Sequence, residues 1–519
     1  MNRTVRNLIR LATIVRTLAR RAALPVEPLT EVAPGVAWLL GQMNRSASGG
    51  FAPQGRPGQR LAAAFEDLGP TFIKLGQALS TRADLVGDEV AGDLALLRDR
   101  LAPFPGSTAA AIVVNELGRP LDQLFATFEP TAVAAASIAQ VHRATTPDGR
   151  AVAVKVLRPG IEAAFRRDID LLYWLAGLAL RLQPRLARLK PLEVVETFRA
   201  TVDLEMDLRM EAAAASELAA NFRDDPGFKV PSIDWDRTAT RVMTLDWVGG
   251  VPVDRLDALR AAGFDPNEIL RHAAEAFFNQ VFRDGFFHAD LHPGNLFVDG
   301  GGALVAVDFG IMGRLDRRTR LYLADMLMGF LNRDYELVAA VHFDAGYVPA
   351  DQSRPLFTQA VRAIGEPLHN KPLHEISVGR LLAQLFAVTE RFNMATQPQL
   401  LLLQKSMLTA EGVGRLLNPA VNMWDLSRPM IEAWMRENRG PEARIAESLA
   451  ALGSLAARLP ELLREGELVL GQLAGGGLQL HPLSLRQLAE EQVRARWRLV
   501  RPLLWLAGGG LVMLAIALR

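Results

Sequence analysis

The sequence predicts an α+β chain in which a short region with strands precedes a long helical region. Residues 151–157, AVAVKVL, alternate apolar side chains with a period of two, which is typical of a half-buried strand after the turn Pro147-Asp148-Gly149. From Val253 onward, apolar residues recur almost throughout at helical spacing. At 519 residues, 50% of them hydrophobic, the chain is long enough to bury two lobes and to carry further segments at both ends.

Three motifs together predict the phosphoryl-transfer site of a bilobal protein-kinase-like fold. Such a site needs a strand lysine for the α- and β-phosphates, a loop aspartate facing the acceptor, and an asparagine and a second aspartate for Mg²⁺. Lys155 lies on the strand, Asp290 precedes Asn295 by five residues in HADLHPGN, and Asp308 opens a DFG after the strand-like residues 303–307. Their order and spacing predict Lys155 and Asp290 as catalytic residues and Asn295 and Asp308 as metal ligands.

The strand lysine needs an anionic partner, and the helical stretch 192–222 offers three acids. At about 100° per residue, Asp207 and Glu211 share a helix face, whereas Glu205 lies about 120° from Glu211. A straight helix therefore cannot aim both glutamates at one ammonium, and we predict Glu211 as the partner of Lys155. The alternative is that these acids only solvate the helix.

Residues 228–248 are expected to form a hairpin-like pair of strands that leads to the hinge between the lobes. The second strand, from Val242 to Trp247, runs into Gly249 and Gly250. At this hinge, adenine would meet the chain at Met243 and Asp246.

The segment expected to cover the phosphates is rich in alanine. A typical kinase uses glycines there, because glycine lets backbone N–H groups approach closely and adopts positive φ. Here the corresponding positions are Ala134, Ala135, Ala136 and Ser137. Methyl groups would lie where the phosphates belong, which argues against ordinary substrate phosphorylation.

A further helix is predicted upstream, around LGPTFIKLGQALS. Its apolar residues form one stripe at helical spacing, which places Lys74 and Gln77 on the opposite face. Periodicity alone favours a solvated polar face.

Taken together, five motifs resemble those of a known family. They are Lys74-Leu-Gly-Gln77, the run Ala134 to His142, Glu205-Met-Asp207, HADLHPGN and DFG, and they look like the KxGQ, alanine-rich, ExD, catalytic and metal motifs of the UbiB/ADCK atypical kinases. The resemblance covers roughly residues 61–417. It implies a kinase-like ATPase that binds ATP or ADP with Mg²⁺ and supports ubiquinone biosynthesis, with the KxGQ helix folded over the site where a protein substrate would bind.

The same resemblance implies roles and partners that spacing does not give. Lys74 and Gln77 would point into the nucleotide site, against the solvated-face interpretation, and Glu205 and Asp207 would help to close it. Expected partners are a quinone-precursor lipid and other ubiquinone biosynthesis proteins. The expected location is the bacterial inner membrane, with the kinase-like domain facing the cytoplasm.

Composition excludes several other classes of chemistry. The chain has no cysteine, which rules out disulfides, thiolate metal sites and cysteine nucleophiles. The formal net charge is +1, and no basic patch is interleaved with aromatic residues, so we expect no nucleic-acid partner.

Both ends of the chain suggest a membrane. Residues 1–44 begin with six arginines among the first 21 residues and no acid before Glu27, interleaved with apolar residues. We predict a basic amphipathic arm lying on an anionic membrane surface, with packing against the protein or a partner as the alternative. Residues 45–60, rich in glycine, proline and serine, predict a flexible linker.

The C-terminal residues 499–519 are predicted to form a hydrophobic membrane helix. Residues 503–518 carry no charge, but at ~1.5 Å per residue these 16 residues span only ~24 Å, short of the ~30 Å hydrocarbon core. Arginines precede the apolar stretch, which favours a cytoplasmic kinase-like domain. A re-entrant hairpin and a helix that forms a homodimer are alternatives.

The predicted organisation between these ends has four parts. They are a helical extension with the KxGQ motif (61–124), an N-lobe with the alanine-rich loop (125–248), a helical C-lobe (249–436) and a helical segment of unknown role (437–498).

Two other functions fit parts of the pattern. In a metal-dependent hydrolase, His288, Asp290 and His292 would gather around one divalent ion, but this leaves Lys155 and the DFG unexplained. A slow nucleotide-sensing scaffold, or a protein that extracts lipid for a quinone biosynthesis complex, would explain the altered phosphate loop and the occluding helix.

Overall fold

The computed structural model describes residues 3–24, 38, 41–44, 55–80, 86–94, 97, 101–182, 191–368, 388, 391–394, 397–421 and 423–439. The chain divides into two compact units, residues 1–434 and 435–519, and the arrangement below is that of the first. Most of the predicted linker, the segment 437–498 beyond Arg439 and the predicted anchor 499–519 lie outside the described residues. Within the described ranges, no helix is both long enough and apolar enough to cross a membrane.

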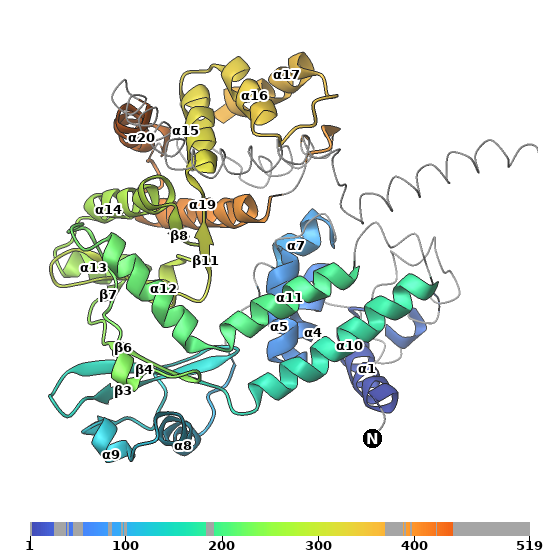
Figure 1. The fold of residues 1–519 in the computed structure, drawn as a ribbon, viewed down its shortest axis with the longest axis vertical. Helices are drawn as coiled ribbons and strands as arrows, with labels where there is room; N and C mark the ends of the chain where they lie inside the picture. The colour runs from blue at the N-terminus through green and yellow to red at the C-terminus, as the bar shows by residue number, and fades with distance from the viewer. Residues whose placement is uncertain are drawn as a thin grey trace, which may run out of the picture. The chain divides into compact units, whose positions relative to one another are not determined.

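A five-stranded antiparallel sheet forms the centre of the first lobe (Figure 1). The order is β1-β3-β4-β6, and β2 also pairs with β3. The strands are β1 (Thr127–Phe128), β2 (Ala134–Ala135), β3 (Ala139–Thr145), β4 (Ala151–Leu157) and β6 (Val242–Asp246). The alternation in β4 has the expected effect, because Val152, Val154 and Val156 are fully buried in one cluster with α8 while Lys155 points to the other face.

The helices of this lobe are α8 (Gly106–Leu117), α9 (Leu121–Leu124), α10 (Ile161–Leu182), α11 (Pro191–Glu205), α12 (Leu208–Asn221) and the 3-10 turn η2 (Trp235–Arg237). The single helix expected over 192–222 is therefore wrong. It breaks after Glu205, and the Asp207 side chain caps α12 by accepting a hydrogen bond from the N–H of Arg209 at 3.1 Å. This break lets Glu205 and Glu211 take separate directions, which a straight helix does not allow.

The helical extension contains α1 (Arg3–Arg20), α4 (Pro57–Leu68), α5 (Pro70–Ser80) and α7 (Asp88–Leu94) (Figure 1). Because α4 begins at Pro57, residues 57–60 of the predicted linker are helical. The glycine of the KxGQ motif allows close packing, since a Cβ at Gly76 would lie 2.3 Å from the Leu97 side chain and 2.8 Å from the Phe65 ring.

The N-terminal helix α1 packs against the protein, which was the alternative to a membrane-surface arm. Arg10 forms a bidentate ion pair with Asp168 of α10, and Arg21 pairs with Asp67 of α4 at 2.7 Å. Arg3 and Arg6 both pair with Asp170. Ile14 is buried, whereas Val5, Leu8 and Ile9 are exposed. A contact of α1 with a membrane stays a prediction.

Two further sheets belong to the second lobe. The first has the order β5-β10-β9-β7, and the second pairs β11 with β8. The strands are β5 (Phe228–Lys229), β7 (Val251–Pro252), β8 (Phe286–His288), β9 (Leu296–Val298), β10 (Leu304–Ala306) and β11 (Met312–Arg314). The hairpin-like pair expected over 228–248 is present only in part: Ile233 and Ala239 form isolated antiparallel bridges to Leu245 and Val242 of β6. The first strand, β5, instead pairs in parallel with β10, and β6 pairs with β4.

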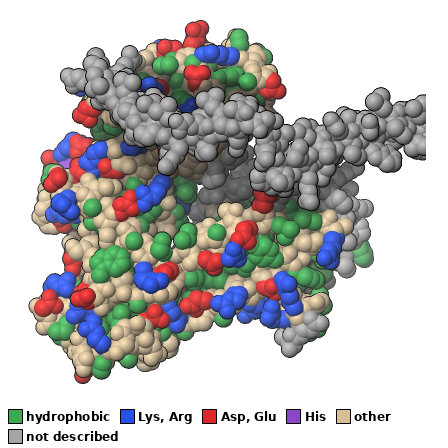
Figure 2. Space-filling model, viewed as in Figure 1, with side chains coloured by type: hydrophobic (Ala, Val, Ile, Leu, Met, Phe, Trp, Pro, Cys, Tyr) green, Lys and Arg blue, Asp and Glu red, His purple; other side chains and the backbone are tan. Residues whose placement is uncertain are grey.

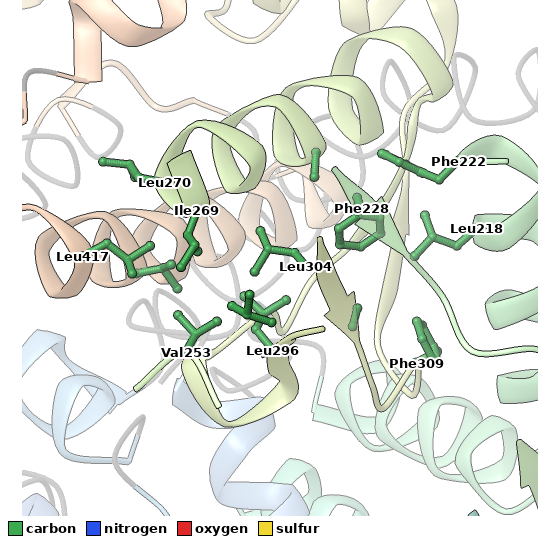
Figure 3. Packing of buried hydrophobic residues seen from close by; sticks show 14 of the residues in the cluster. Leu218, Phe222, Phe228, Val253, Ile269, Leu270, Leu296, Leu304, Phe309 and Leu417 are labelled. Atoms are coloured by element: carbon green, nitrogen blue, oxygen red, sulfur yellow. The ribbon is translucent and has the colours of Figure 1, made fainter. Parts of the chain in front are cut away.

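Apart from these strands, the described residues of the second lobe are mainly helical, as the apolar spacing predicted. Its elements are α13 (Leu256–Ala261), α14 (Pro266–Phe278), the π-helical turn η3 (Asn279–Asp284), η4 (Pro293–Asn295), α15 (Arg317–Leu331), α16 (Tyr335–Asp344), α17 (Arg354–Gly365), η5 (Glu366–Leu368), α19 (Pro398–Leu417) and α20 (Met423–Arg439). Figure 3 shows Leu296 and Leu304 in one buried cluster with Phe309 of the DFG motif. The loops that carry the predicted site therefore start and end in a packed core.

The described part of the face in Figure 2 carries basic and acidic side chains intermixed over the same elements. Many charged side chains of the described residues form ion pairs across elements, such as Arg314 of β11 with Glu217 of α12.

Candidate phosphoryl-transfer site

An ion-pair cluster joins the two lobes at the predicted site. The Lys155 Nζ atom lies 2.6 Å from Oε1 of Glu211 and 3.0 Å from Oδ1 of Asp308. Lys155 and Glu211 are largely buried, whereas 48% of the Asp308 side chain is exposed. The predicted partner of the strand lysine is thus in place, and the carboxylate of the DFG motif is the accessible member of the cluster.

The three charges shift one another's pKa. Burial acts to lower the pKa of Lys155, but the carboxylates of Asp308 and Glu211 outweigh it and hold that pKa above its usual value. The Lys155 ammonium is the main cause of the lowered pKa of Asp308. Burial raises the pKa of Glu211, with Lys155 opposing this and Asp308 adding to it. Lys155 and Asp308 are therefore both charged at neutral pH, as binding of phosphates and a cation requires.

The DFG backbone holds Asp308 toward the lysine. Asp308 adopts a φ of 67°, an unfavourable region for a residue with a side chain. Its neighbour Phe309 is buried in the core, and the Phe309 N–H donates a hydrogen bond to Oε1 of Glu211 at 3.2 Å. The strain at Asp308 is thus held by packing and hydrogen bonding on its C-terminal side.

The catalytic loop is anchored through His288, which is fully buried. The Asp290 N–H donates to Nδ1 of His288 at 3.0 Å, so Nε2 carries the proton and donates to the carbonyl oxygen of Asp308. Burial is the main cause of the lowered pKa of His288, which keeps the ring neutral at pH 7. The His288 N–H donates to Oε1 of Gln280 in η3, directly before the loop. His288 therefore ties the loop of Asp290 to the DFG motif.

Asn295 and Asp308 lie beside each other at this junction. The Val307 N–H donates to the Asn295 carbonyl oxygen at 2.9 Å, and the Asn295 side chain donates to the carbonyl oxygen of Asp290 at 3.2 Å. One amide oxygen and one accessible carboxylate fit Mg²⁺, which takes oxygen ligands, few of them from protein, together with substrate phosphates. The donor set therefore fits the predicted metal, and the binding itself stays a prediction.

One residue of the site carried no signal in the sequence. Lys405 of α19 places its Nζ atom 2.8 Å from Oδ1 of Asp290. It belongs to no motif and lies far downstream of the catalytic loop, so only the fold reveals it.

The KxGQ helix brings a second lysine to this region. The Nζ atom of Lys74 on α5 lies 2.9 Å from Oε2 of Glu205, and both side chains are largely buried. The charge of Lys74 also contributes to the lowered pKa of Asp308, after the larger effect of Lys155. A solvated polar face is therefore wrong for Lys74. Gln77 is half-buried on the same helix, and its contact with nucleotide stays a prediction.

The alanine-rich run forms an ordinary β-hairpin. Ala134 and Ala135 form β2 and pair with β3, and the Ala136 N–H donates to the carbonyl oxygen of Ala139 at 2.8 Å. Ser137 is fully buried. None of the residues 134–137 has a positive φ. The backbone therefore does not adopt the conformations that a glycine loop uses to wrap phosphates.

Arg158 binds the backbone of this hairpin and of the segment before α8. Its Nε and Nη2 atoms donate to the Ala136 carbonyl oxygen at 3.0 and 2.8 Å, and its Nη1 atom donates to the carbonyl oxygen of Ala102 at 2.9 Å. A fixed guanidinium that binds backbone oxygens on two segments resists rearrangement of the hairpin.

Three predicted site residues lie outside the ion-pair cluster. Met243 is buried on β6, opposite Lys155 in the register of β4. Asp246, at the end of β6, contacts Arg150 at 3.3 Å. Asp207 binds Arg209 and caps α12. Their contacts with adenine or with the closed nucleotide site stay predictions.

His288 is not arranged to ligate a metal together with Asp290 and His292, as a hydrolytic centre would need. Both ring nitrogens of His288 are hydrogen bonded, and Nδ1 of His292 accepts from the N–H of Gly294 at 3.1 Å. Within the described part of the chain, no group of three or more histidines, cysteines and acids is arranged to hold a metal ion.

Comparison with known proteins agrees with this geometry. Over 463 residues the chain is 43% identical to a "Probable protein kinase UbiB" from Marinobacter nauticus, covering 88% of this chain and 85% of that protein. The chain belongs to the UbiB family. A "Probable protein kinase UbiB" from Pseudomonas aeruginosa is 45% identical over 389 residues, 74% of this chain and 73% of that protein.

Two family models match separate parts of the chain. The ABC1 atypical kinase-like domain matches residues 96–342, and the UbiB helical domain matches residues 361–422. A solved structure titled as the complex of Rv3197 with erythromycin, from Mycobacterium tuberculosis, matches with a TM-score of 0.51 at 24% identity. It covers 76% of this chain and 97% of that chain, and it supports the kinase-like fold.

Proposed function

We propose that this UbiB-family protein binds a Mg²⁺-nucleotide and transfers or hydrolyses its terminal phosphoryl group in support of ubiquinone biosynthesis. The observation that carries the proposal is the contact of Lys155 with both Glu211 and Asp308, beside the loop that presents Asp290. In this role Lys155 binds the α- and β-phosphates, Asn295 and Asp308 hold the cation, and Mg²⁺ neutralises charge on the phosphates.

Nucleotide binding and turnover by the full-length protein test this proposal. The assay measures phosphate release from ATP with and without liposomes that contain a quinone-precursor-like lipid. Replacing Asp308 by Asn removes the charge that fits the cation, and Mg²⁺-ATP should bind at least roughly tenfold more weakly. Equal affinity for Mg²⁺-ATP in wild type and Asp308→Asn would contradict the assignment of the metal site.

A second candidate is a slow nucleotide-sensing scaffold or lipid-extracting protein. Two observations favour it: the Lys74 and Glu205 pair, which holds the KxGQ helix to α11, and the lock of Arg158 on the alanine-rich hairpin. Both resist the opening that a protein substrate needs. In the same assay this candidate predicts tight nucleotide binding and negligible turnover under all lipid conditions.

We further propose attachment to the inner membrane through the apolar residues 499–519, with the kinase-like domain on the cytoplasmic side. The arginines of α1 that pair with Asp168 and Asp170 are engaged within the protein, so α1 alone should hold the membrane weakly. Deleting 499–519 should make the protein extractable by high salt from the membrane pellet. A truncated protein that resists both salt and carbonate would contradict the anchor.

A further inference from the structure

The catalytic loop of this chain, residues 288–295, contains no lysine or arginine that could bind the Asp290 carboxylate. Two residues after Asp290 stands His292, whose Nδ1 accepts from the Gly294 N–H and caps η4. Its ring thus shapes the loop backbone. The cation that contacts the Asp290 carboxylate arrives from a distant helix: Lys405 of α19 lies 2.8 Å from Oδ1.

The position of Lys405 is fixed by its neighbours on α19. Ser406 is almost fully buried, and its hydroxyl contacts the carbonyl oxygens of Leu402 at 2.9 Å and of His288 at 3.4 Å. Leu403 is buried as well. Ser406 contacts the strand that leads into the catalytic loop. This contact fixes the backbone of α19 so that Lys405, the preceding residue, lies beside Asp290.

We propose that Lys405 is a positioning residue for phosphoryl transfer, acting through Asp290. By binding Oδ1 it fixes the rotamer of the carboxylate and leaves Oδ2 to orient the attacking hydroxyl or water. In the transfer, the nucleophile oxygen bonds to the γ-phosphorus, and the bond to the β–γ bridging oxygen breaks with its electron pair remaining on ADP. The nucleophile proton passes to Asp290. This inference rests on the proposed function.

The inference gives the helical domain a part in the chemistry. Lys405 lies within the match to the UbiB helical domain, residues 361–422, and outside the match to the kinase-like domain, residues 96–342. The aspartate of one domain is thus completed by a lysine of the other.

If the pair of Lys405 and Asp290 had only a structural role, removing the ammonium would lower the stability of the fold. The side chains of Lys405 and Asp290 are 35% and 34% exposed, and ion pairs of this kind contribute little to stability. Removing the ammonium should therefore leave folding intact while misplacing the carboxylate, which lowers turnover without lowering nucleotide affinity.

The test compares Lys405→Met and Lys405→Arg with wild type in the full-length protein. For Lys405→Met we expect kcat to fall roughly 10- to 100-fold, with KM, nucleotide affinity and melting temperature close to wild type. Lys405→Arg keeps the cation and should recover part of the loss. Lys229→Met is the control, because the 55% exposed side chain of Lys229 forms an ion pair with Asp299 at 2.6 Å away from the proposed site. Its kcat should equal that of wild type.

The outcomes separate the two levels of the argument. Wild-type kcat in Lys405→Met overturns the positioning role and leaves the proposed function standing. A loss of nucleotide affinity or melting temperature that accounts for the fall in kcat also overturns it, as does an arginine variant no better than methionine. Absence of turnover in the wild-type protein under every lipid condition overturns both.

Discussion

The ion pair of Arg10 with Asp168 should fasten α1 to the protein, and replacing Arg10 by Met tests this. Arg10 Nε and Nη2 lie 2.7 and 2.8 Å from the two carboxylate oxygens, and the side chains are only 16% and 2% exposed. Arg10 also lies over the ring of Phe72, at 5.6 Å from its centroid. The methionine keeps an apolar stem at this position, so the change removes the guanidinium and its contacts while most of the packing remains.

The stability lost in Arg10→Met depends on the burial of Asp168 and on its remaining contact with Arg167. Leaving a buried charge unpaired costs about 3 to 5 kcal/mol. Asp168 keeps a contact with Arg167 at 3.1 Å, but that arginine is 43% exposed, so it compensates only in part. We expect a loss of about 2 to 3 kcal/mol in the local stability of α1, which corresponds to roughly 30- to 150-fold faster amide exchange.

Hydrogen exchange of the α1 amides measures this directly. Arg3→Met is the control, because the side chain of Arg3 is 61% exposed, its partner Asp170 keeps Arg6, and such pairs are worth about 1 kcal/mol or less. The double variant Arg10→Met with Asp168→Asn should regain part of the loss, because the buried charge is gone. Equal exchange rates in Arg10→Met and Arg3→Met would refute the reasoning.

Two further predictions concern the hairpin and pH. Ala135→Gly should loosen β2 so that a backbone N–H reaches the phosphates. One or two such hydrogen bonds would shift the ratio of ATP to ADP affinity toward ATP at least roughly tenfold. An unchanged ratio in titrations of both nucleotides would contradict this. Burial is the main cause of the lowered pKa of His142, His288 and His342. The unfolded chain therefore binds more protons below the usual value of 6.5, and the free energy of unfolding should fall by up to about 1.4 kcal/mol per pH unit per histidine as pH drops from there. Urea titrations across this range should show a shallower dependence for His342→Gln, and an equal dependence would contradict the burial argument.

Much of the site was predictable because its residues carry local signals. Lys155 lies in an alternating strand, and Asp290 and Asn295 have loop spacing. Glu211 was the correct choice for the lysine, although the helix angle only separated it from Glu205 and assumed one straight helix. The break before α12 was not predicted, although Asp207 is a typical capping residue. The apolar spacing continues across the two residues between α11 and α12, so it predicts one helix. The break explains why Glu205 reaches Lys74 while Glu211 reaches Lys155.

Contacts between distant segments could not be predicted from one sequence. Lys405 contacts Asp290, and Arg10 contacts Asp168, only after several elements have packed. Neither Lys405 nor Arg10 belongs to a sequence motif. The parallel pairing of β5 with β10 was missed for the same reason. Two apolar stretches close in sequence predicted a hairpin-like pair. The tertiary fold places β5 and β6 in different sheets, and only isolated bridges from Ile233 and Ala239 to β6 match that prediction.

The measurement that tests the central claim most directly separates nucleotide binding from turnover in Asp290→Asn. In the proposed function, Asp290 faces the nucleophile, while Lys155, Asn295 and Asp308 bind the nucleotide and its cation. The variant should therefore bind Mg²⁺-ATP with an affinity close to wild type and release phosphate at least roughly 100-fold more slowly. Turnover equal to wild type in Asp290→Asn would contradict the assignment of this loop as the phosphoryl-transfer site.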